Sequence, residues 1–380
     1  MANKKKTLKI IGKTALIVLL SVIVLVSGYV VYFAGSFYRI NDNLSLPPVN
    51  KTQDTLLTST EYTMLNWNIG FGAYSDNYSF FMDGGKYSRG FSENAVQKNL
   101  DGIKERVSAA ATKYTNKKGF DFICYQEVDY EATRSYQIDQ RKFLYNFHDT
   151  YSYVFAQNYD SPYILYPFNE PHGANKAGIM TFSKYRIESA IRKQVPVEKG
   201  FMKYLDLDRC YSKTRISVNK GESDLVLINL HLSAYTSDGT IAIDQLKLLL
   251  ADCKQEVEKG NYVICAGDFN KDLVGYADVS GESSATLFDD TSATEGWAKQ
   301  IDSKVFEKTG MSKVEYTEYT EDPFPSCRNA DRPYSEGNKV YIVDGFLISD
   351  NVQVIDALVL NEQFKYSDHN PVVMSFKLKK

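Results

Sequence analysis

The sequence predicts an α/β or α+β domain that follows a separate apolar segment. Short apolar runs typical of β-strands recur from residue 62 to residue 377, and stretches with apolar residues at helical spacing fall between them. The runs are unevenly spaced, which argues against a solenoid built from repeats. With 43% hydrophobic and 24% charged residues, the composition is that of a globular protein able to bury a sizeable core.

The first 38 residues differ from the rest of the chain. Residues 1–13 form a basic N-terminus, and residues 14–38 contain no charged side chain and are rich in Leu, Val and Ile. Because about 20 apolar residues span a bilayer, we expect residues 14–38 to form a transmembrane anchor rather than a buried core helix. A cleaved signal peptide is the main alternative, but its apolar core is usually about 7–15 residues long, and Phe33-Ala34-Gly35 is a poor cleavage site.

The charge distribution predicts how the chain is oriented. Five lysines precede the anchor and a single Arg39 follows it closely, so the positive-inside rule predicts a single-pass cell-membrane protein with a cytoplasmic N-terminus and an extracytoplasmic body. Beyond the five lysines, 39 of the 44 basic residues remain against 47 acidic residues, a net charge of about −8. Such a body does not hold nucleic acid by charge alone, although a bound divalent metal could still support nuclease chemistry.

The elements of the domain can be assigned in order. Residues 39–60 are polar and are expected to form a linker to a domain at 61–380. Strands are predicted at 62–68, 120–125, 151–155, 178–182, 215–218, 225–230, 262–266, 340–348 and 372–377. Helices are predicted at 92–111 and 241–257. Residues 280–335 are polar and punctuated by Gly and Pro, and are expected to be a long loop or insertion within this one domain.

The five cysteines show no close pair and no metal-type spacing. Cys124 and Cys265 lie inside strand runs and are expected to be inert core thiols. A domain outside the cell could form a disulfide. Because the number of cysteines is odd, at least one thiol would remain unpaired unless it pairs with another chain.

Polar side chains follow several predicted strands at the point where each strand ends. They are Asn68, Glu127, His231, Asp268 and Asn270. Because ligand sites in α/β sheets gather beyond the carboxyl ends of strands, we expect these residues to converge on one cleft. Each also has an ordinary explanation by itself: Asn68 suits a turn, Glu127 can be solvated and His231 can be structural.

The segment Gly267-Asp268-Phe269-Asn270 carries the clearest local signal. It follows an apolar strand, and strand geometry would point Asp268 and Asn270 to the same side. Both offer the oxygen ligands that Mg²⁺ prefers, although a turn after a strand also favours Gly, Asp and Asn.

A second candidate group lies near the C-terminus. Ser367-Asp368-His369 precedes the last strand, and a carboxylate beside an imidazole can fix its tautomer. Adjacent residues on a strand point to opposite faces, so the orienting partner of His369 is expected elsewhere, with Asp344 as the leading candidate.

Six motifs occur in a specific order along the chain. They are Asn68, Gln126-Glu127, His231-Leu232, Gly267-Asp268-Phe269-Asn270, Asp344 with Ser349, and Ser367-Asp368-His369. This order resembles the endonuclease/exonuclease/phosphatase superfamily, which includes DNase I-like nucleases, bacterial sphingomyelinases and inositol polyphosphate 5-phosphatases. Residues 177–187 also look like the central strand motif of that family, and the resemblance covers residues 60–378. It implies a four-layer α/β sandwich of two packed mixed β-sheets flanked by helices, with the site at their common edge.

The resemblance also implies roles for individual residues. Glu127, with Asn68 nearby, would hold Mg²⁺, with Mn²⁺ as the alternative ion, and Asp368 would lie near the metal. Asp268 would position and deprotonate the attacking water, and Asn270 would bind a phosphate oxygen.

Two histidines complete the implied site. His369 would contact the scissile phosphate, oriented by Asp344, and His231 would stabilise the phosphate or the leaving oxygen. These roles suit phosphoryl transfer, which needs charge neutralisation and an in-line nucleophile. A histidine at position 231 resembles DNase I-like and sphingomyelinase-like members and argues against abasic-site DNA repair.

We therefore expect a membrane-anchored, extracytoplasmic, Mg²⁺-dependent phosphoesterase, most simply a phosphodiesterase acting on nucleic acid, a phospholipid headgroup or a small phosphoester. No protein partner is predicted. A non-catalytic surface binding module that keeps the fold is the alternative, but its mark, a lost metal or water-activating residue, is not found in the sequence.

Some features leave the substrate open. Lys176, Arg328 and Arg332 are candidate phosphate contacts, or solvated loop charges. Tyr-rich segments at 73–87 and 151–166 could line a lipid- or base-binding surface, although packing explains them more simply. No apolar hairpin of the kind that inserts into membranes stands out.

Overall fold

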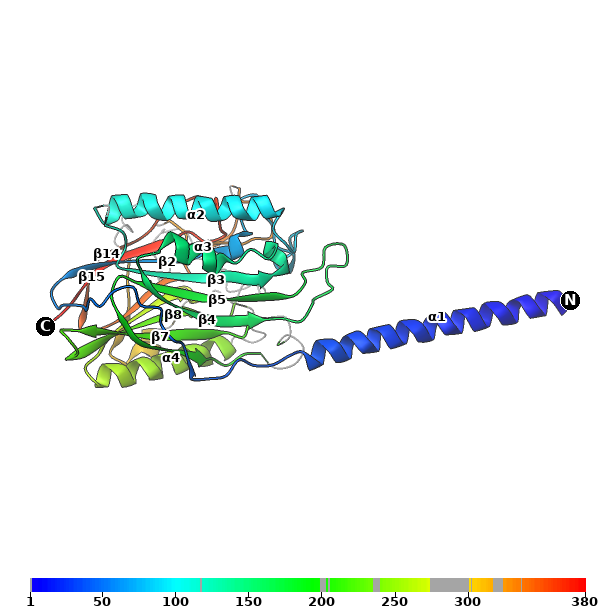
Figure 1. The fold of residues 1–380 in the computed structure, drawn as a ribbon, viewed down its shortest axis with the longest axis horizontal. Helices are drawn as coiled ribbons and strands as arrows, with labels where there is room; N and C mark the ends of the chain where they lie inside the picture. Colours follow the sequence, from blue (N-terminus) through cyan, green and yellow to red (C-terminus); the bar gives the residue numbers. More distant parts are fainter. Residues whose placement is uncertain are drawn as a thin grey trace.

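Two β-sheets pack face to face and helices cover their outer faces (Figure 1). The structure is a computed structural model that describes residues 2–116, 118–198, 203, 206–234, 240–273, 301, 303–316, 324–335 and 337–380. The predicted four-layer α/β sandwich of two mixed sheets is confirmed.

The first sheet has six strands in the order β14-β15-β2-β3-β5-β4. In chain order these strands are β2 (Glu61–Asn68), β3 (Phe122–Ala132), β4 (Ser152–Asp160), β5 (Asn175–Ser183), β14 (Val352–Val359) and β15 (Val372–Leu378). The β2 and β3 strands run parallel, and the other neighbours run antiparallel. Their apolar outer faces pack under the helices α2 (Glu93–Tyr114) and α3 (Gln140–Phe147).

The second sheet has seven strands in the order β1-β6-β7-β8-β9-β13-β10. In chain order they are β1 (Leu44–Ser45), β6 (Ile187–Gln194), β7 (Cys210–Val218), β8 (Ser223–His231), β9 (Tyr262–Asp268), β10 (Met311–Lys313) and β13 (Asp344–Ser349). Here β8 and β9 are the parallel pair. The helix α4 (Thr240–Glu258) packs on its outer face.

The predicted helices follow from their apolar spacing. In α2, the side chains of Val96, Leu100, Ile103 and Val107 are buried, and Ser92 caps the helix by accepting a hydrogen bond from the Ala95 amide at 3.1 Å. In α4, Leu246, Leu249, Leu250 and Cys253 are buried. The five cysteines are free and buried, so the core positions expected for Cys124 and Cys265 are confirmed.

The predicted strand at 340–348 is wrong in one respect, because it is two strands. Residues Val340–Tyr341 form β12, which pairs with β11 (Cys327–Arg328) in a separate ribbon, whereas β13 pairs with β9. The break falls where the Val343 amide donates to Ser326 Oγ at 3.0 Å instead of to a neighbouring strand. Of the expected insertion at 280–335, only residues 301, 303–316 and 324–335 are described, and the rest lies outside the described residues.

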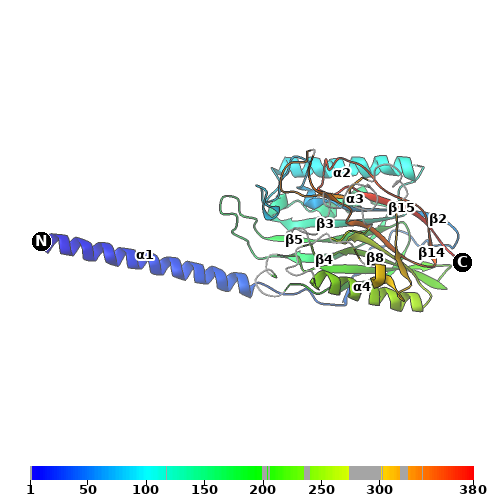
Figure 2. The same ribbon diagram turned by 180° about the vertical axis from the view of Figure 1, so that it is seen from behind.

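The N-terminal helix α1 (Ala2–Gly35) extends away from the domain in both views (Figures 1 and 2). Its length and apolar composition would suffice to cross a membrane, and nearly all of its described side chains are exposed. The segment that follows lies along the domain: β1 pairs with β6, and Leu46 and Leu56 enter the core between the sheets.

Candidate active site

The ends of four strands meet at one edge of the sandwich. Asn68 ends β2, His231 ends β8 and Asp268 ends β9. Register places His231 beside Asp268 in the parallel β8–β9 pair, and Asp344 opposite Asp268 in the antiparallel β9–β13 pair. The parallel pairs therefore bring polar residues from distant parts of the chain to one place, as expected for the carboxyl ends of parallel strands.

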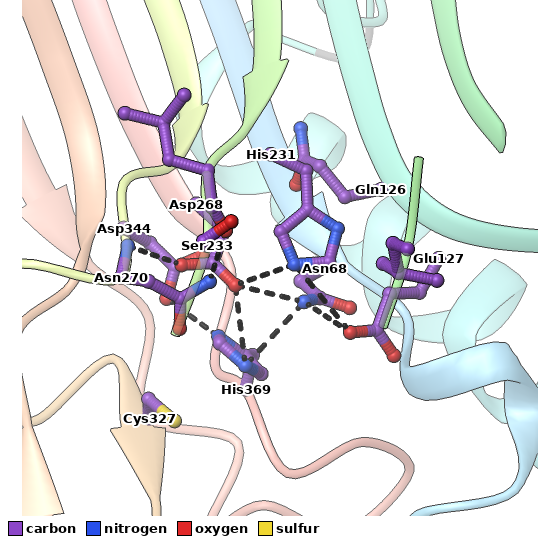
Figure 3. A network of polar contacts seen from close by, with 12 residues as sticks. Asn68, Gln126, Glu127, His231, Ser233, Asp268, Asn270, Cys327, Asp344 and His369 are labelled. Atoms are coloured by element: carbon purple, nitrogen blue, oxygen red, sulfur yellow. Dashed lines mark hydrogen bonds and ion pairs between the residues drawn. The ribbon is translucent and has the colours of Figure 1, made fainter. Parts of the chain in front are cut away.

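Glu127 reaches this edge from inside a strand. The register of β3 against β5 shifts between Tyr125 and Val128, and Glu127 has a φ of 56°. A positive φ is costly for a residue with a side chain, and a β-bulge of this kind re-aims a side chain next to a functional site. The bulge turns the Glu127 carboxylate toward Asn68 and His231 (Figure 3).

A buried polar clamp holds the two sheets together behind the site. Gln126 Nε2 donates to Asn66 Oδ1 and to Asn229 Oδ1, both at 2.7 Å. Asn66 and Gln126 belong to the first sheet and Asn229 to the second. Gln126 is therefore structural, and it fixes the spacing of the strands that carry Asn68 and His231.

The Asp268 carboxylate is the centre of the site (Figure 3). Its Oδ2 lies 3.1 Å from Asn68 Nδ2 and 3.4 Å from His231 Nε2, and 3.8 Å from His369 Nε2. Burial raises the pKa of Asp268, although His369 and the Asn270 amide oppose this. A buried carboxylate with a raised pKa is a better proton acceptor than an exposed one.

Asn270 reaches the site by a turn. The expectation that strand geometry aligns it with Asp268 is wrong, because β9 ends at Asp268 and Asn270 adopts a left-handed conformation with φ 49°. The Asn270 amide donates to Asp268 Oδ1 at 2.8 Å, and its side chain donates to the Leu232 carbonyl at 2.8 Å. The turn nevertheless leaves both side chains lining the same cavity.

The two histidines of the site are held in opposite charge states. His369 Nδ1 lies 2.7 Å from Asp344 Oδ2. Burial lowers the pKa of His369, but Asp344, Cys327 and Asp268 together raise it well above its ordinary value. The pKa of His231 is lowered well below its ordinary value, chiefly by burial and to a smaller extent by the charges of Arg209 and His369. His369 is therefore an imidazolium at neutral pH, and His231 is neutral.

Glu127 and Asp368 are neighbouring buried carboxyl groups, each of which opposes ionisation of the other. Burial raises the pKa of Glu127 to about 8, and the charge of Asp368 contributes to this shift. Glu127 Oε2 is buried without a hydrogen-bond partner among the described residues. At Gly70, a Cβ would lie 2.9 Å from Asp368 Oδ1, so glycine allows this close approach. Repelling carboxylates with an unpartnered oxygen fit a divalent cation, which would relieve both defects.

A second acidic set lies next to this pair. Ligand atoms of Asp268, Asp344 and His369 all lie within 4.8 Å of one another, which also fits a metal. However, His369 Nδ1 is already engaged by the 2.7 Å contact with Asp344, whereas its Nε2 lies 3.8 Å from Asp268 Oδ2, beyond hydrogen-bond distance. Glu127 and Asp368 are therefore the better candidates for metal ligands, and Asn68 Nδ2 donates to Glu127 Oε1 at 3.2 Å.

The site opens into a cavity of about 140 Å³. Its polar lining includes Glu127, His231, Asp268, Asn270, Asp368 and His369, and its aromatic and apolar lining includes Phe71, Tyr74, Phe80, Met82, Tyr159 and Leu207. Of these aromatic and apolar residues, Tyr74, Phe80, Met82 and Tyr159 fall in the Tyr-rich segments at 73–87 and 151–166, whereas Phe71 and Leu207 had no predicted role.

Arg209, which was not among the predicted site residues, also lines the cavity and is 3% exposed. Its Nη2 contacts Asp206 at 3.1 Å, whereas its Nε and Nη1 have no partner among the described residues. A buried guanidinium with two free donors at a cavity suits an anionic ligand. In the sequence, Arg209 is marked only by its position just before β7 in a charged segment. A solvated loop has the same composition.

The other predicted basic contacts lie differently. Arg328 lines the cavity but donates to the carbonyls of Ser75 and Tyr78, so it braces a loop. Lys176 pairs with Glu131 at 2.8 Å, and Arg332 donates to the Gly337 carbonyl. Ser349 lies at the far end of β13, where its Oγ accepts from the Val263 amide, so it is not part of the site.

Solved structures with similar folds share little sequence with the chain. An endonuclease/exonuclease/phosphatase protein from Beutenbergia cavernae matches with 15% identity and a TM-score of 0.52, over 84% of this chain and 72% of that chain. The human Nocturnin catalytic domain with bound sulfate matches with 15% identity and a TM-score of 0.50, over 88% and 97%. D. rerio TDP2 with a single-strand DNA product matches with 14% identity and a TM-score of 0.50, over 84% and 100%. These likenesses show the fold, and no curated protein sequence matches.

A family model gives the stronger evidence. The model of the Endonuclease/Exonuclease/phosphatase family matches residues 65–369, which span every candidate site residue from Asn68 to His369. Members of this family are generally phosphoester hydrolases and typically depend on a divalent metal. The chain belongs to the endonuclease/exonuclease/phosphatase family.

Proposed function

We propose that the chain is a Mg²⁺-dependent phosphoester hydrolase, specifically a phosphodiesterase. One observation carries the proposal: the buried Asp268 carboxylate lies within 3.8 Å of both a charged and a neutral histidine, at a cavity that is also lined by the carboxyl groups of Glu127 and Asp368. This arrangement provides a proton acceptor and hydrogen-bond donors around a space for one phosphoryl group. No residue needed for these tasks is missing, which favours catalysis over a non-catalytic binding module.

Glu127 and Asp368, with Asn68 beside them, would hold the ion, and Mn²⁺ is the alternative to Mg²⁺. When bound, the ion would neutralise charge on the phosphoryl oxygens and on the leaving group. Glu127 Oε2, which is buried without a hydrogen-bond partner among the described residues, would gain a ligand in the ion.

The side chains divide the remaining work. Asp268 orients the attacking water and accepts its proton, and the imidazolium of His369 donates from Nε2 to a phosphoryl oxygen. Asp344 holds the other nitrogen of His369 at 2.7 Å and keeps the ring oriented. Neutral His231 donates from Nε2 to the phosphoryl or leaving oxygen, and Asn270 contributes a further donor.

We further propose that α1 anchors the protein in the cell membrane with the domain outside the cytoplasm. The lysines at the start of α1 and the single arginine after it support this orientation. Phospholipid headgroups, nucleic acids and small phosphoesters are the candidate substrates.

The test is hydrolysis by the full-length protein in detergent micelles. We expect turnover of at least one member of a panel of nucleic acids, phospholipids and small phosphodiesters with Mg²⁺, and loss of that turnover with EDTA. Calorimetry should detect Mg²⁺ binding by the wild type and weaker binding by Glu127→Gln, with Glu131→Gln, an exposed position on the same strand, as the matched control. No turnover across the panel and no Mg²⁺ binding would support the non-catalytic binding module instead.

A further inference from the structure

The connection between β4 and β5 exposes several large apolar side chains. This segment, residues 161–174, is called the β4–β5 loop. The exposed fractions are 37% for Tyr163, 39% for Leu165, 60% for Tyr166 and 84% for Phe168. The loop projects from the end of the domain that α1 leaves (Figures 1 and 2). Contiguous exposed apolar residues of this kind mark an interaction surface.

The β4–β5 loop is attached to α1 through two tyrosines. The Tyr29 hydroxyl donates to the Tyr163 carbonyl at 3.0 Å and accepts from the Leu165 amide at 3.2 Å. The Tyr32 hydroxyl accepts from the Tyr163 amide at 3.1 Å. Because these bonds involve the loop backbone, the loop is held at a fixed level along the helix.

That level is the surface of a bilayer that α1 would span. The charge-free part of α1 begins at Thr14. At about 1.5 Å per residue, Tyr29 and Tyr32 lie roughly 22 and 27 Å further along the helix. The hydrocarbon core is about 30 Å thick, and tyrosines concentrate at its boundary. The loop bonded to these tyrosines therefore meets the lipid at the outer interface.

We infer that the β4–β5 loop is a second membrane contact, in which Tyr166 and Phe168 insert into the outer interface of the bilayer beside α1. The inference rests on the membrane anchor in the proposed function. Residues 161–174 contain no Lys or Arg, and Glu170, the one acidic residue, accepts from the Ser88 amide at 2.8 Å. Insertion is therefore driven by apolar burial, and it needs neither anionic lipid nor low salt.

Ring contacts and an ion pair connect the segments next to the membrane with the cavity lining. Tyr166 contacts Phe81 with ring centroids 5.9 Å apart, and Phe81 contacts His172, which lines the cavity. On another side of the cavity, Arg39, just after α1, pairs with Asp208, which lies between the lining residues Leu207 and Arg209. Both connections place the cavity close to the lipid surface, where a phosphoester in a headgroup is the nearest substrate.

The test is fluorescence quenching with the full-length protein reconstituted in phosphatidylcholine vesicles whose acyl chains carry bromine near the headgroup. Tryptophan is introduced by Phe168→Trp, and the parent protein gives the background of Trp67 and Trp297. Ile355→Trp is the matched control, because Ile355 is 40% exposed on β14. We expect bromolipid to quench the added fluorescence of Phe168→Trp strongly and that of Ile355→Trp little, with no change in 0.5 M salt.

Two results would overturn the inference, and they can be told apart. If the protein resists alkaline carbonate extraction but Phe168→Trp is quenched no more than Ile355→Trp, the loop does not enter the bilayer although the anchor does. If carbonate releases the protein from the vesicles, the anchor itself is wrong and the loop inference fails with it.

Discussion

Asp344 lies directly opposite Asp268 in the β9–β13 register, yet its carboxylate contacts His369 Nδ1 at 2.7 Å. Two neighbouring carboxylates thus share one imidazolium, since His369 Nε2 lies 3.8 Å from Asp268 Oδ2. The imidazolium offsets one of the two negative charges, and the Asp268 carboxylate remains available to accept a proton.

Asp344→Asn should lower the pKa of His369. Burial lowers this pKa, and the negative charge of Asp344, which the amide removes, is the largest of the effects that raise it. With Asp344 present, His369 stays protonated through neutral pH, and the activity that depends on its charge is lost only at higher pH. In the variant this loss should occur at lower pH, with a decrease of about 100-fold or more in kcat at pH 8. The pH–rate profile measures the shift, with Asp350→Asn as an exposed control just after the same strand. An unchanged alkaline limb would contradict this role of Asp344.

Arg209→Gln should weaken the binding of phosphate-bearing ligands, because the free Nε and Nη1 donors are lost. A hydrogen bond to a charged group contributes about 1.5–3 kcal/mol, so KM should rise by about 10- to 100-fold. Arg209→Lys keeps the charge but loses the fork and should show a smaller increase. Steady-state kinetics and inhibition by inorganic phosphate measure the effect. Arg141→Gln, which removes a guanidinium paired with Asp139 and outside the cavity lining, is the control. Equal constants in all variants would show that Arg209 does not touch substrate.

Glu256→Gln should destabilise the fold more at neutral pH than in acid. Burial alone would raise the pKa of Glu256, but Arg215 and Lys213 lower it to about 2 from its ordinary value of 4.5. A lowered folded-state pKa contributes stability that is present above pH 4.5 and is lost as the pH falls toward 2. The gap in urea midpoint between wild type and variant should therefore be large at pH 7 and narrow at pH 3. Glu258→Gln, with a side chain 63% exposed, is the control. A gap that does not change with pH would contradict the assignment.

Much of the site could be predicted because several of its residues have a recognisable position in the local sequence pattern. Asn68, His231 and Asp268 each end an apolar strand, and parallel pairing makes such ends meet whatever the details of packing. The expected partner of His369, Asp344, does contact it. The rule that neighbours on a strand face apart does not account for this contact, because Asp368 and His369 precede β15. The strand geometry expected for Asn270 was wrong, because the left-handed turn after Asp268 interrupts the strand periodicity.

Other features depend on tertiary contacts that no local pattern records. The β6 strand was missed because its inner face carries the buried Arg192 and its register shifts near Ser189, so the apolar alternation is broken. The β14 strand was missed for a similar reason, a register shift between Val354 and Asp356. The roles of Arg209 and of the β4–β5 loop follow only from their neighbours in space, the cavity for Arg209 and α1 for the loop.

The most direct test of the central claim is hydrolysis by Asp268→Asn. The amide keeps the size of the side chain but cannot accept a proton from water, so with Mg²⁺ present kcat should fall by about 100- to 10,000-fold. Asp101→Asn, at an exposed position on α2, should retain the wild-type rate, and circular dichroism should show that both variants are folded. A folded Asp268→Asn variant that hydrolyses the same phosphoester at the wild-type rate would contradict the account.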